Sequence, residues 1–145
     1  QAITSTQFST TSTSFVDVTG FVKSITPSST SNKILVSITF RFGATGANSN
    51  RAQIRRSSTS ISLGSTQNNL SNVYAAHGGT TQGGDMYSIN YIDSPSTTSS
   101  TEYALQVSNS QDTGGLVTRV NGRNDGSSNS NISGAITLME IAGWL

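Results

Sequence analysis

The most informative feature of the sequence is one segment in which large apolar side chains occupy every second position. These side chains are Ile34, Val36, Ile38, Phe40 and Phe42. Side chains of a β-strand alternate between the two faces of a sheet, so all five lie on one face. The residues between them are of mixed character. The segment therefore predicts a strand that forms one wall of a sandwich, with an apolar inner face.

Three further segments show the same period of two, at residues 87–91, 103–107 and 132–138. In the last of them, Gly134 interrupts the apolar row. Met139 and Ile141 face the other way, so we expect this strand to be buried on both faces over part of its length. Weaker strand signals lie at residues 15–18, 21–25, 51–56, 60–63, 73–76 and 116–120.

The segments between these strands are rich in turn residues. Gly, Asn and Asp cluster at 43–50, 64–71, 78–84, 112–115 and 121–131, and Asp93-Ser94-Pro95 ends the strand before it. No segment shows a sustained helical period with caps, so we expect no helix longer than a turn. About eight to ten short strands separated by turns indicate a sandwich, a barrel or a jelly roll.

Length and composition are consistent with one folded domain over residues 1–145. Only 32% of the residues are hydrophobic and 10% are charged, but the net charge is +1, whereas disorder usually accompanies high net charge. We therefore expect a folded β domain with long polar loops. Because the chain starts at Gln1 rather than Met, we also expect it to be the C-terminal part of a longer protein.

The charges and apolar stretches exclude some classes of partner. Arg51, Arg55 and Arg56 form the only basic cluster, which is too small to predict nucleic-acid binding. No apolar stretch is long enough to predict membrane insertion. The chain has no Cys, which excludes disulfides and thiolate metal sites.

The sequence also offers little for catalysis. A Ser-His-Asp arrangement around the single histidine, His77, is formally possible, but no G-x-S-x-G pattern accompanies it. We predict no enzyme activity, no cofactor and no metal site. Glu102 and Glu140 lie within strand segments. Because a buried carboxylate needs a partner, we expect Glu140 to form a structural ion pair with Arg41 or Arg119.

The polar loops leave one candidate for ligand binding. Amide and hydroxyl groups suit hydrogen bonds to sugar hydroxyls, and an aromatic face can stack on a sugar ring. The candidate residues are Asn68, Asn69, Tyr74, His77 and Gln82. The alternative interpretation is that these side chains only solvate a loop.

Several segments together resemble a domain found near the C-terminus of tail-fibre-like and virion structural proteins of marine phages. The opening, Phe8 to Gly20, is similar to the start of that domain. Ser24-Ile25-Thr26-Pro27-Ser28-Ser29, followed by Lys33-Ile34-Leu35-Val36, resembles its core. Tyr91-Ile92-Asp93-Ser94-Pro95 resembles its middle signature, and Ile136-Thr137-Leu138-Met139-Glu140-Ile141-Ala142 resembles its end. The similarity spans nearly the whole chain and is weakest between Gly43 and Gly84.

The resemblance implies a jelly-roll-like antiparallel β-sandwich that assembles as a homotrimer on the virion and has no catalytic residues. Gly143-Trp144-Leu145 departs from the family pattern, and Trp144 is a candidate for contact with a neighbouring subunit. Tyr87, Tyr91 and Met139 are further candidates for the subunit interface.

Two functions follow from this resemblance. The first is a tail-fibre, receptor-binding domain that contacts host surface glycans and is joined to a fibre shaft. The alternative is a trimeric capsid decoration or cement protein that stabilises the phage head. A jelly-roll fold alone does not separate them. The scarcity of acids and the single His argue against a third possibility, a polysaccharide-degrading enzyme.

Overall fold

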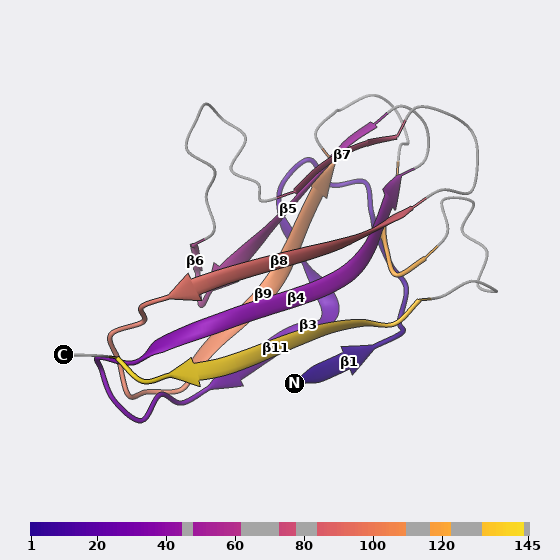
Figure 1. The fold of residues 1–145 in the computed structure, drawn as a ribbon. Helices are drawn as coiled ribbons and strands as arrows, with labels where there is room; N and C mark the ends of the chain where they lie inside the picture. The colour runs from indigo at the N-terminus through magenta and orange to yellow at the C-terminus, as the bar shows by residue number, and fades with distance from the viewer. Residues whose placement is uncertain (45–47, 62–72, 78–83, 110–116, 123–131, 144–145) are drawn as a thin grey trace.

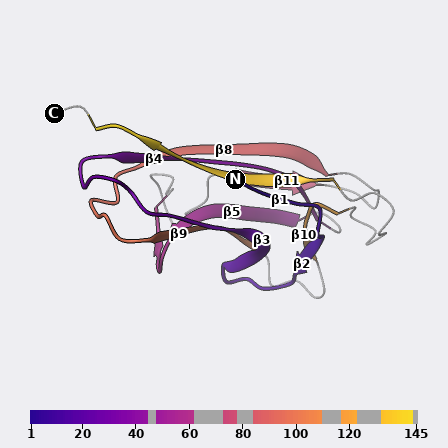
Figure 2. The ribbon, with the colours of Figure 1, turned by 90° about the horizontal axis from the view of Figure 1, so that it is seen from below.

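A computed structural model of the chain describes residues 1–44, 48–61, 73–77, 84–109, 117–122 and 132–143. For residues 44, 48, 49 and 73–77 it describes the backbone alone. Within these ranges the chain is all-β and contains no helix. The strands form two antiparallel sheets, A and B, which face each other as the two layers of a sandwich (Figures 1 and 2).

Sheet A is built around the long strand β4 (Lys33–Ala44). One edge of β4 pairs with β8 (Asp85–Asp93). The other edge pairs with β11 (Gly134–Ile141) and, beyond it, with β10 (Thr118–Val120). β1 (Ala2–Thr4) pairs with β11, and β2 (Phe8–Thr10) pairs with β10. β1 and β2 therefore lie end to end and together occupy one strand position in the sheet. β10 and β11 do the same at the neighbouring position.

Sheet B has β9 (Thr101–Asn109) at its centre. β9 pairs with β3 (Val16–Ile25) on one side and with β5 (Asn48–Arg56) on the other. Two short strands, β6 (Thr59–Ser60) and β7 (Val73–His77), pair with successive parts of the other edge of β5.

The core lies between the sheets and follows the alternation in the sequence. The five apolar side chains of β4 that define the period of two are all fully buried. β9 supplies Tyr103, Leu105 and Val107 from the opposite layer, as predicted. Phe21 completes this layer from β3, with its ring 6.3 Å from that of Phe40. These burials confirm the predicted sandwich wall.

The interruption at Gly134 is explained by close packing around it. An added Cβ would lie 2.5 Å from Cζ of Phe21 and 2.7 Å from the carbonyl oxygen of Thr39. The Phe21 ring therefore fills the space that a side chain at this position of β11 would occupy.

Three local predictions differ from the structure. Residues 15–18 and 21–25 form one strand, β3, because a bulge with Gly20 at φ 86° lets pairing resume after the irregularity. The short strands β1 and β2 carry too few residues to show a period, so the sequence did not predict them. The predicted turn at 43–50 is shorter, because β4 runs to Ala44 and β5 starts at Asn48.

The prediction that the last strand is buried on both faces was wrong for the single chain. Met139 is 54% exposed and Ile141 is 37% exposed. Both side chains lie on the outer face of sheet A, opposite to Ile136, which is fully buried.

Candidate interaction surface

The outer face of sheet A carries a row of apolar side chains across three neighbouring strands. Leu35 of β4 lies directly opposite Ile92 of β8 on one side and Met139 of β11 on the other. Ile92 is 56% exposed, and Leu35 is partly exposed between its two neighbours. Ile141 extends the row along β11. We call these four residues the apolar row.

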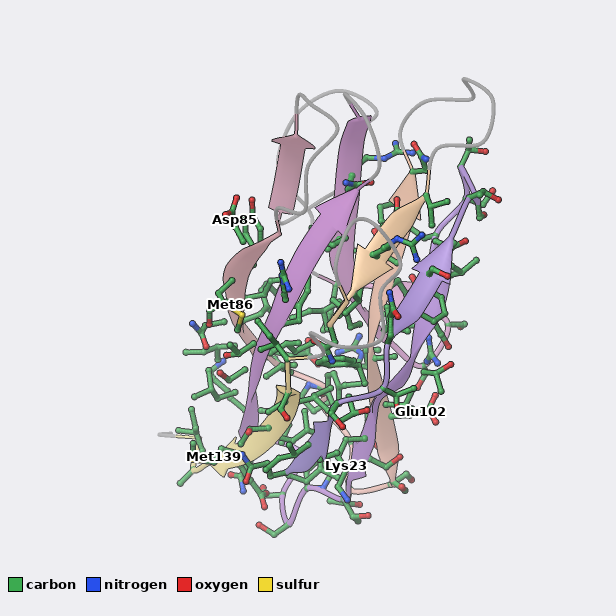
Figure 3. The ribbon with its side chains drawn as sticks, turned by 90° about the vertical axis from the view of Figure 1, so that its right-hand side faces the viewer. Lys23, Asp85, Met86, Glu102 and Met139 are labelled. Carbon is green, nitrogen blue, oxygen red and sulfur yellow. The ribbon has the colours of Figure 1, made fainter. Side chains whose placement is uncertain are left out.

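Figure 3 shows how the two outer faces lie. Met86 and Met139 are on one side of the sandwich, and Glu102 is on the other. Met86 is 50% exposed on β8, and Ile3 of β1 adds an exposed apolar side chain beside Ala135. Contiguous exposed apolar surface of this kind marks interaction sites more often than scattered single residues do.

The outer face of sheet B is polar and internally paired. Arg55 of β5 lies between two carboxylates: Nε donates to Oδ1 of Asp17 at 2.8 Å, and Nη2 is 2.9 Å from Oε1 of Glu102. Hydrogen bonding from Arg55 to Asp17 is the main reason that the pKa of Asp17 is lowered and that the pKa of Arg55 is raised. Glu102, which lies within a strand as predicted, thus forms an ion pair with Arg55.

Gln106 and Gln53 extend this polar cluster across the sheet. Gln106 Nε2 donates to Oδ1 of Asp17 at 2.9 Å, and Gln53 Nε2 donates to Oε1 of Gln106 at 2.8 Å. The charges on this face are therefore mutually satisfied and fixed by neighbouring strands.

Glu140 does not form the predicted pair with Arg41 or Arg119. Its Oε1 instead accepts hydrogen bonds from the backbone N–H of Ser28 at 2.6 Å, from the Ser28 hydroxyl at 2.9 Å and from Asn32 Nδ2 at 2.7 Å. These neutral donors, Asn32 first, lower the pKa of Glu140. The alternation of β11 places the carboxylate over the turn between β3 and β4, where backbone and amide donors are within reach.

A buried charged cluster ties the two sheets together at one end. Asp93, at the end of β8, is 6% exposed. Both of its carboxylate oxygens accept from Arg56 Nη1 of β5 at 2.9 Å, and Oδ2 accepts from the Tyr103 hydroxyl of β9 at 2.7 Å. Burial, followed by the hydrogen bond to Asp93, raises the pKa of Tyr103 above its ordinary value. Asp93 is therefore a structural anion whose charge is compensated inside the fold.

The predicted ligand-binding residues receive no test from this structure. Asn68, Asn69 and Gln82 lie outside the described residues. Tyr74 and His77 belong to β7, whose backbone pairs with β5 opposite Arg51 and Asn48. Their role as a glycan-binding patch stays a prediction.

The predicted interface residues lie on different faces. Tyr87 and Tyr91 point inward from β8 and are partly buried against the core. The Tyr87 ring lies 6.0 Å from that of Phe42 in a T-shaped contact, and burial is the main cause of its raised pKa. Met139 is exposed on the outer face, and Trp144 lies outside the described residues.

Sequence reasoning missed Leu35 and Ile92 as members of the exposed row. The available signal was that apolar residues also occupy the second face of the strands at 34–42 and 85–93, at Leu35, Met86 and Ile92. In the described part of the chain, no group of three or more His, Cys, Asp or Glu could hold a metal ion. None of the described elements is a helix long and apolar enough to cross a membrane.

Comparison with known proteins gave no relative: no family model matches the chain, and no curated protein matches it.

Proposed function

We propose that this chain is a non-enzymatic virion surface domain: the receptor-binding part of a phage tail fibre, assembled as a homotrimer and contacting glycans of the host surface. The observation that carries the proposal is the strand order. With β1 and β2, β6 and β7, and β10 and β11 each counted as one strand, the eleven strands in the described part of the chain reduce to eight. Numbered 1 to 8 along the chain, these combined strands lie side by side in the order 1-8-3-6 in sheet A and 2-7-4-5 in sheet B. This is the order that a jelly roll would have, and jelly rolls are common in viral capsid and lectin domains, so the strand order supports the proposal.

The contacts between segments that resemble the phage family add support. Glu140, in the closing segment, is bound by Ser28 of the core segment. Asp93, in the middle signature, is bound by Tyr103 and Arg56. These residues therefore have a structural role that explains why such segments would occur together in one sequence.

The apolar row supports assembly of several copies. Its side chains are exposed or, at Leu35, partly exposed in the single chain, and burial of apolar surface favours association by roughly 25 cal/mol per Å² before the entropic costs of binding. An obligate trimer would bury such a face between subunits.

Glycan-array binding by the purified protein tests the receptor-binding part of the proposal. We expect binding to a restricted set of bacterial surface glycans, and loss of that binding in Tyr74→Ala and His77→Ala variants that keep the wild-type melting temperature. No binding to any bacterial glycan, or unchanged binding by both variants, would contradict this role. Release of reducing sugar ends from the bound glycans would contradict the non-enzymatic assignment.

A further inference from the structure

The edges of the two sheets differ in how they are protected against pairing with further strands. β3, the edge of sheet B, has a bulge between Asp17 and Val22, a glycine at positive φ and the exposed Lys23. Bulges and Lys residues are common devices that prevent edge-to-edge association. β1 and β2 have three residues each, and the far edge of sheet B is divided between β6, with two residues, and β7, with five. These edges are too short or too irregular to act as templates.

β8 has none of these protections. It has nine residues, and they pair with β4 in an unbroken register from Asp93 opposite Ile34 to Asp85 opposite Phe42. Its sequence contains no Lys, Arg, Pro or Gly. Among the described strands only β4 pairs with it, so its second edge has no strand partner there.

One hydrogen bond and the register of β4 with β8 show which backbone groups point to this open edge. The carbonyl of Arg41 accepts from the N–H of Asn121 at 3.0 Å, next to β10. The N–H and C=O of one strand residue point to the same edge, and successive residues alternate. Residues 34, 36, 38 and 40 of β4 therefore face β8, and Ile38 pairs with Ile89. It follows that the backbone groups of residues 86, 88, 90 and 92 point to the open edge.

The sequence of β8 is nearly symmetric about Ile89. Ser88 and Asn90, both small, polar and exposed, flank it, and Tyr87 and Tyr91 lie next on either side. Met86 and Ile92, both apolar and at least half exposed, end the symmetric stretch. A strand of this pattern is complementary to an antiparallel copy of itself, as a twofold interface requires.

We propose that β8 pairs with β8 of a second copy of this chain, antiparallel, with Ile89 on the twofold axis. Ser88 then lies opposite Asn90 of the second copy, and Met86 lies opposite Ile92. The pairing joins the two A sheets into one continuous sheet. In this pairing, Met86 of each copy packs against Ile92 of the other, so that both exposed side chains become covered. The apolar row is thereby extended toward the second copy.

The charges at the ends of β8 permit this register. Asp85 would lie opposite Asp93 of the second copy, and directly opposed like charges weaken a strand pair. Asp93, however, points inward and is already compensated by Arg56, with both carboxylate oxygens 2.9 Å from Nη1. The repulsion is therefore confined to the ends of the paired segment.

Cysteine cross-linking tests the register directly, because the chain has no cysteine of its own. In a hydrogen-bonded antiparallel pair the Cα atoms lie about 5.5 Å apart, within the range of a disulfide. We expect mild oxidation of a mixture of Ser88→Cys and Asn90→Cys proteins to give a covalent pair in several-fold higher yield than either protein alone. Thr39→Cys is the matched control. Thr39 lies on β4, directly opposite Ser88 and on the same face of the sheet, but one strand away from the open edge. Equal yields in all samples, or no product, would overturn the proposal.

Sedimentation over a range of concentrations separates this pairing from the proposed trimer. Asn90→Pro removes an N–H that points to the open edge while leaving the bonds to β4 intact. If both contacts exist, wild type reaches an even-numbered state such as a hexamer, and Asn90→Pro stops at a trimer. A dimer that Asn90→Pro converts to monomer supports the β8 pairing and contradicts the trimer. A wild-type trimer that forms no larger species and no register-specific cross-link overturns the β8 pairing alone.

Discussion

Glu140 and Ser28, which are 112 positions apart in the sequence, are joined by two hydrogen bonds to one carboxylate oxygen. The backbone N–H of Ser28 donates at 2.6 Å and its hydroxyl at 2.9 Å. The contact attaches β11 to the turn that connects the two sheets. Asn32 adds a third bond to the same oxygen, and its Oδ1 accepts from the N–H of Gly143 at 3.0 Å.

The Glu140 contact predicts a stability difference that depends on pH. The pKa of Glu140 is lowered in the folded protein, below its ordinary value of 4.5. A depressed carboxyl pKa stabilises the fold above the unfolded-state pKa, and this contribution is lost as the pH falls through the folded-state pKa. We expect Glu140→Gln to melt at a lower temperature than wild type at neutral pH, and the gap to close as the pH falls below 4.5 and through the lowered folded-state pKa of Glu140. A gap that is absent at neutral pH, or that persists unchanged in acid, would sink this account.

The buried cluster at Asp93 predicts strong energetic coupling between strands of the two sheets. Arg56→Ala would leave the Asp93 carboxylate with only the Tyr103 hydroxyl as a side-chain donor among the described residues. We expect a loss of about 2–4 kcal/mol in the free energy of unfolding, somewhat reduced because Arg56 is 30% exposed. Denaturant unfolding of Arg56→Ala, Asp93→Ala and the double variant measures the coupling. Additive effects of the two single substitutions would contradict the pairing.

Tyr103 predicts a spectroscopic signature of the same cluster. Its raised pKa means that its phenol stays protonated at pH values that ionise an exposed tyrosine. In a titration followed by absorbance of the phenolate, we expect the ionisation of Tyr103 to be delayed until the protein unfolds. Tyr103→Phe should remove this delayed step and leave the others in place. A wild-type curve with every tyrosine ionising near pH about 10 before unfolding would be inconsistent with the buried bond to Asp93.

Gly134 predicts that a single methyl group destabilises the core. In Gly134→Ala the new Cβ would meet the Phe21 ring and the backbone carbonyl of Thr39, and the latter cannot move aside as a flexible side chain does. We expect a cost of about 1–3 kcal/mol or more in the free energy of unfolding. Gly84→Ala is the control, since its Cβ would meet only the flexible side chain of Arg41. Equal melting temperatures for both variants would show that the Phe21 packing is looser than described.

The apolar row predicts an effect on assembly rather than on folding. Met139→Lys places a charge in the apolar row at an exposed position, so the melting temperature of the monomer should change little. If this face lies between subunits, we expect light scattering to show a shift from trimer to monomer. Val22→Lys, on the partly exposed outer face of sheet B, is the control and should leave the assembly unchanged. Dissociation by Val22→Lys but not by Met139→Lys would place the interface on the other sheet.

The extent to which the sequence predicts this fold varies by element. The alternation from Ile34 to Phe42 is long enough to identify the central strand and its buried face. The tertiary partners of polar residues are not predictable in this way. Glu140 has apolar neighbours in sequence, and only the pairing of β11 with β4 brings it above Ser28. Arg55 and Arg56 are adjacent in the chain, yet they bind carboxylates on opposite faces of sheet B.

Exposure at a candidate surface is likewise decided by the strand order. Met139 has the same apolar character as a core residue, and one face of β11 is open only because nothing in the described chain covers the outer side of sheet A. Because Tyr87 and Tyr91 alternate with polar residues, the pattern predicts that they share a face. Which face is buried follows from the pairing of β8 with β4, where both tyrosines align with inward-facing residues.

The measurement that tests the central claim most directly is the position and copy number of this protein in intact phage particles, imaged at near-atomic resolution. We predict three copies of this β-sandwich domain around each threefold axis at the tip of a tail fibre, with few copies per particle. Hundreds of copies at threefold positions on the capsid would instead assign the protein as a cement protein. Its absence from the particle would contradict the virion role altogether.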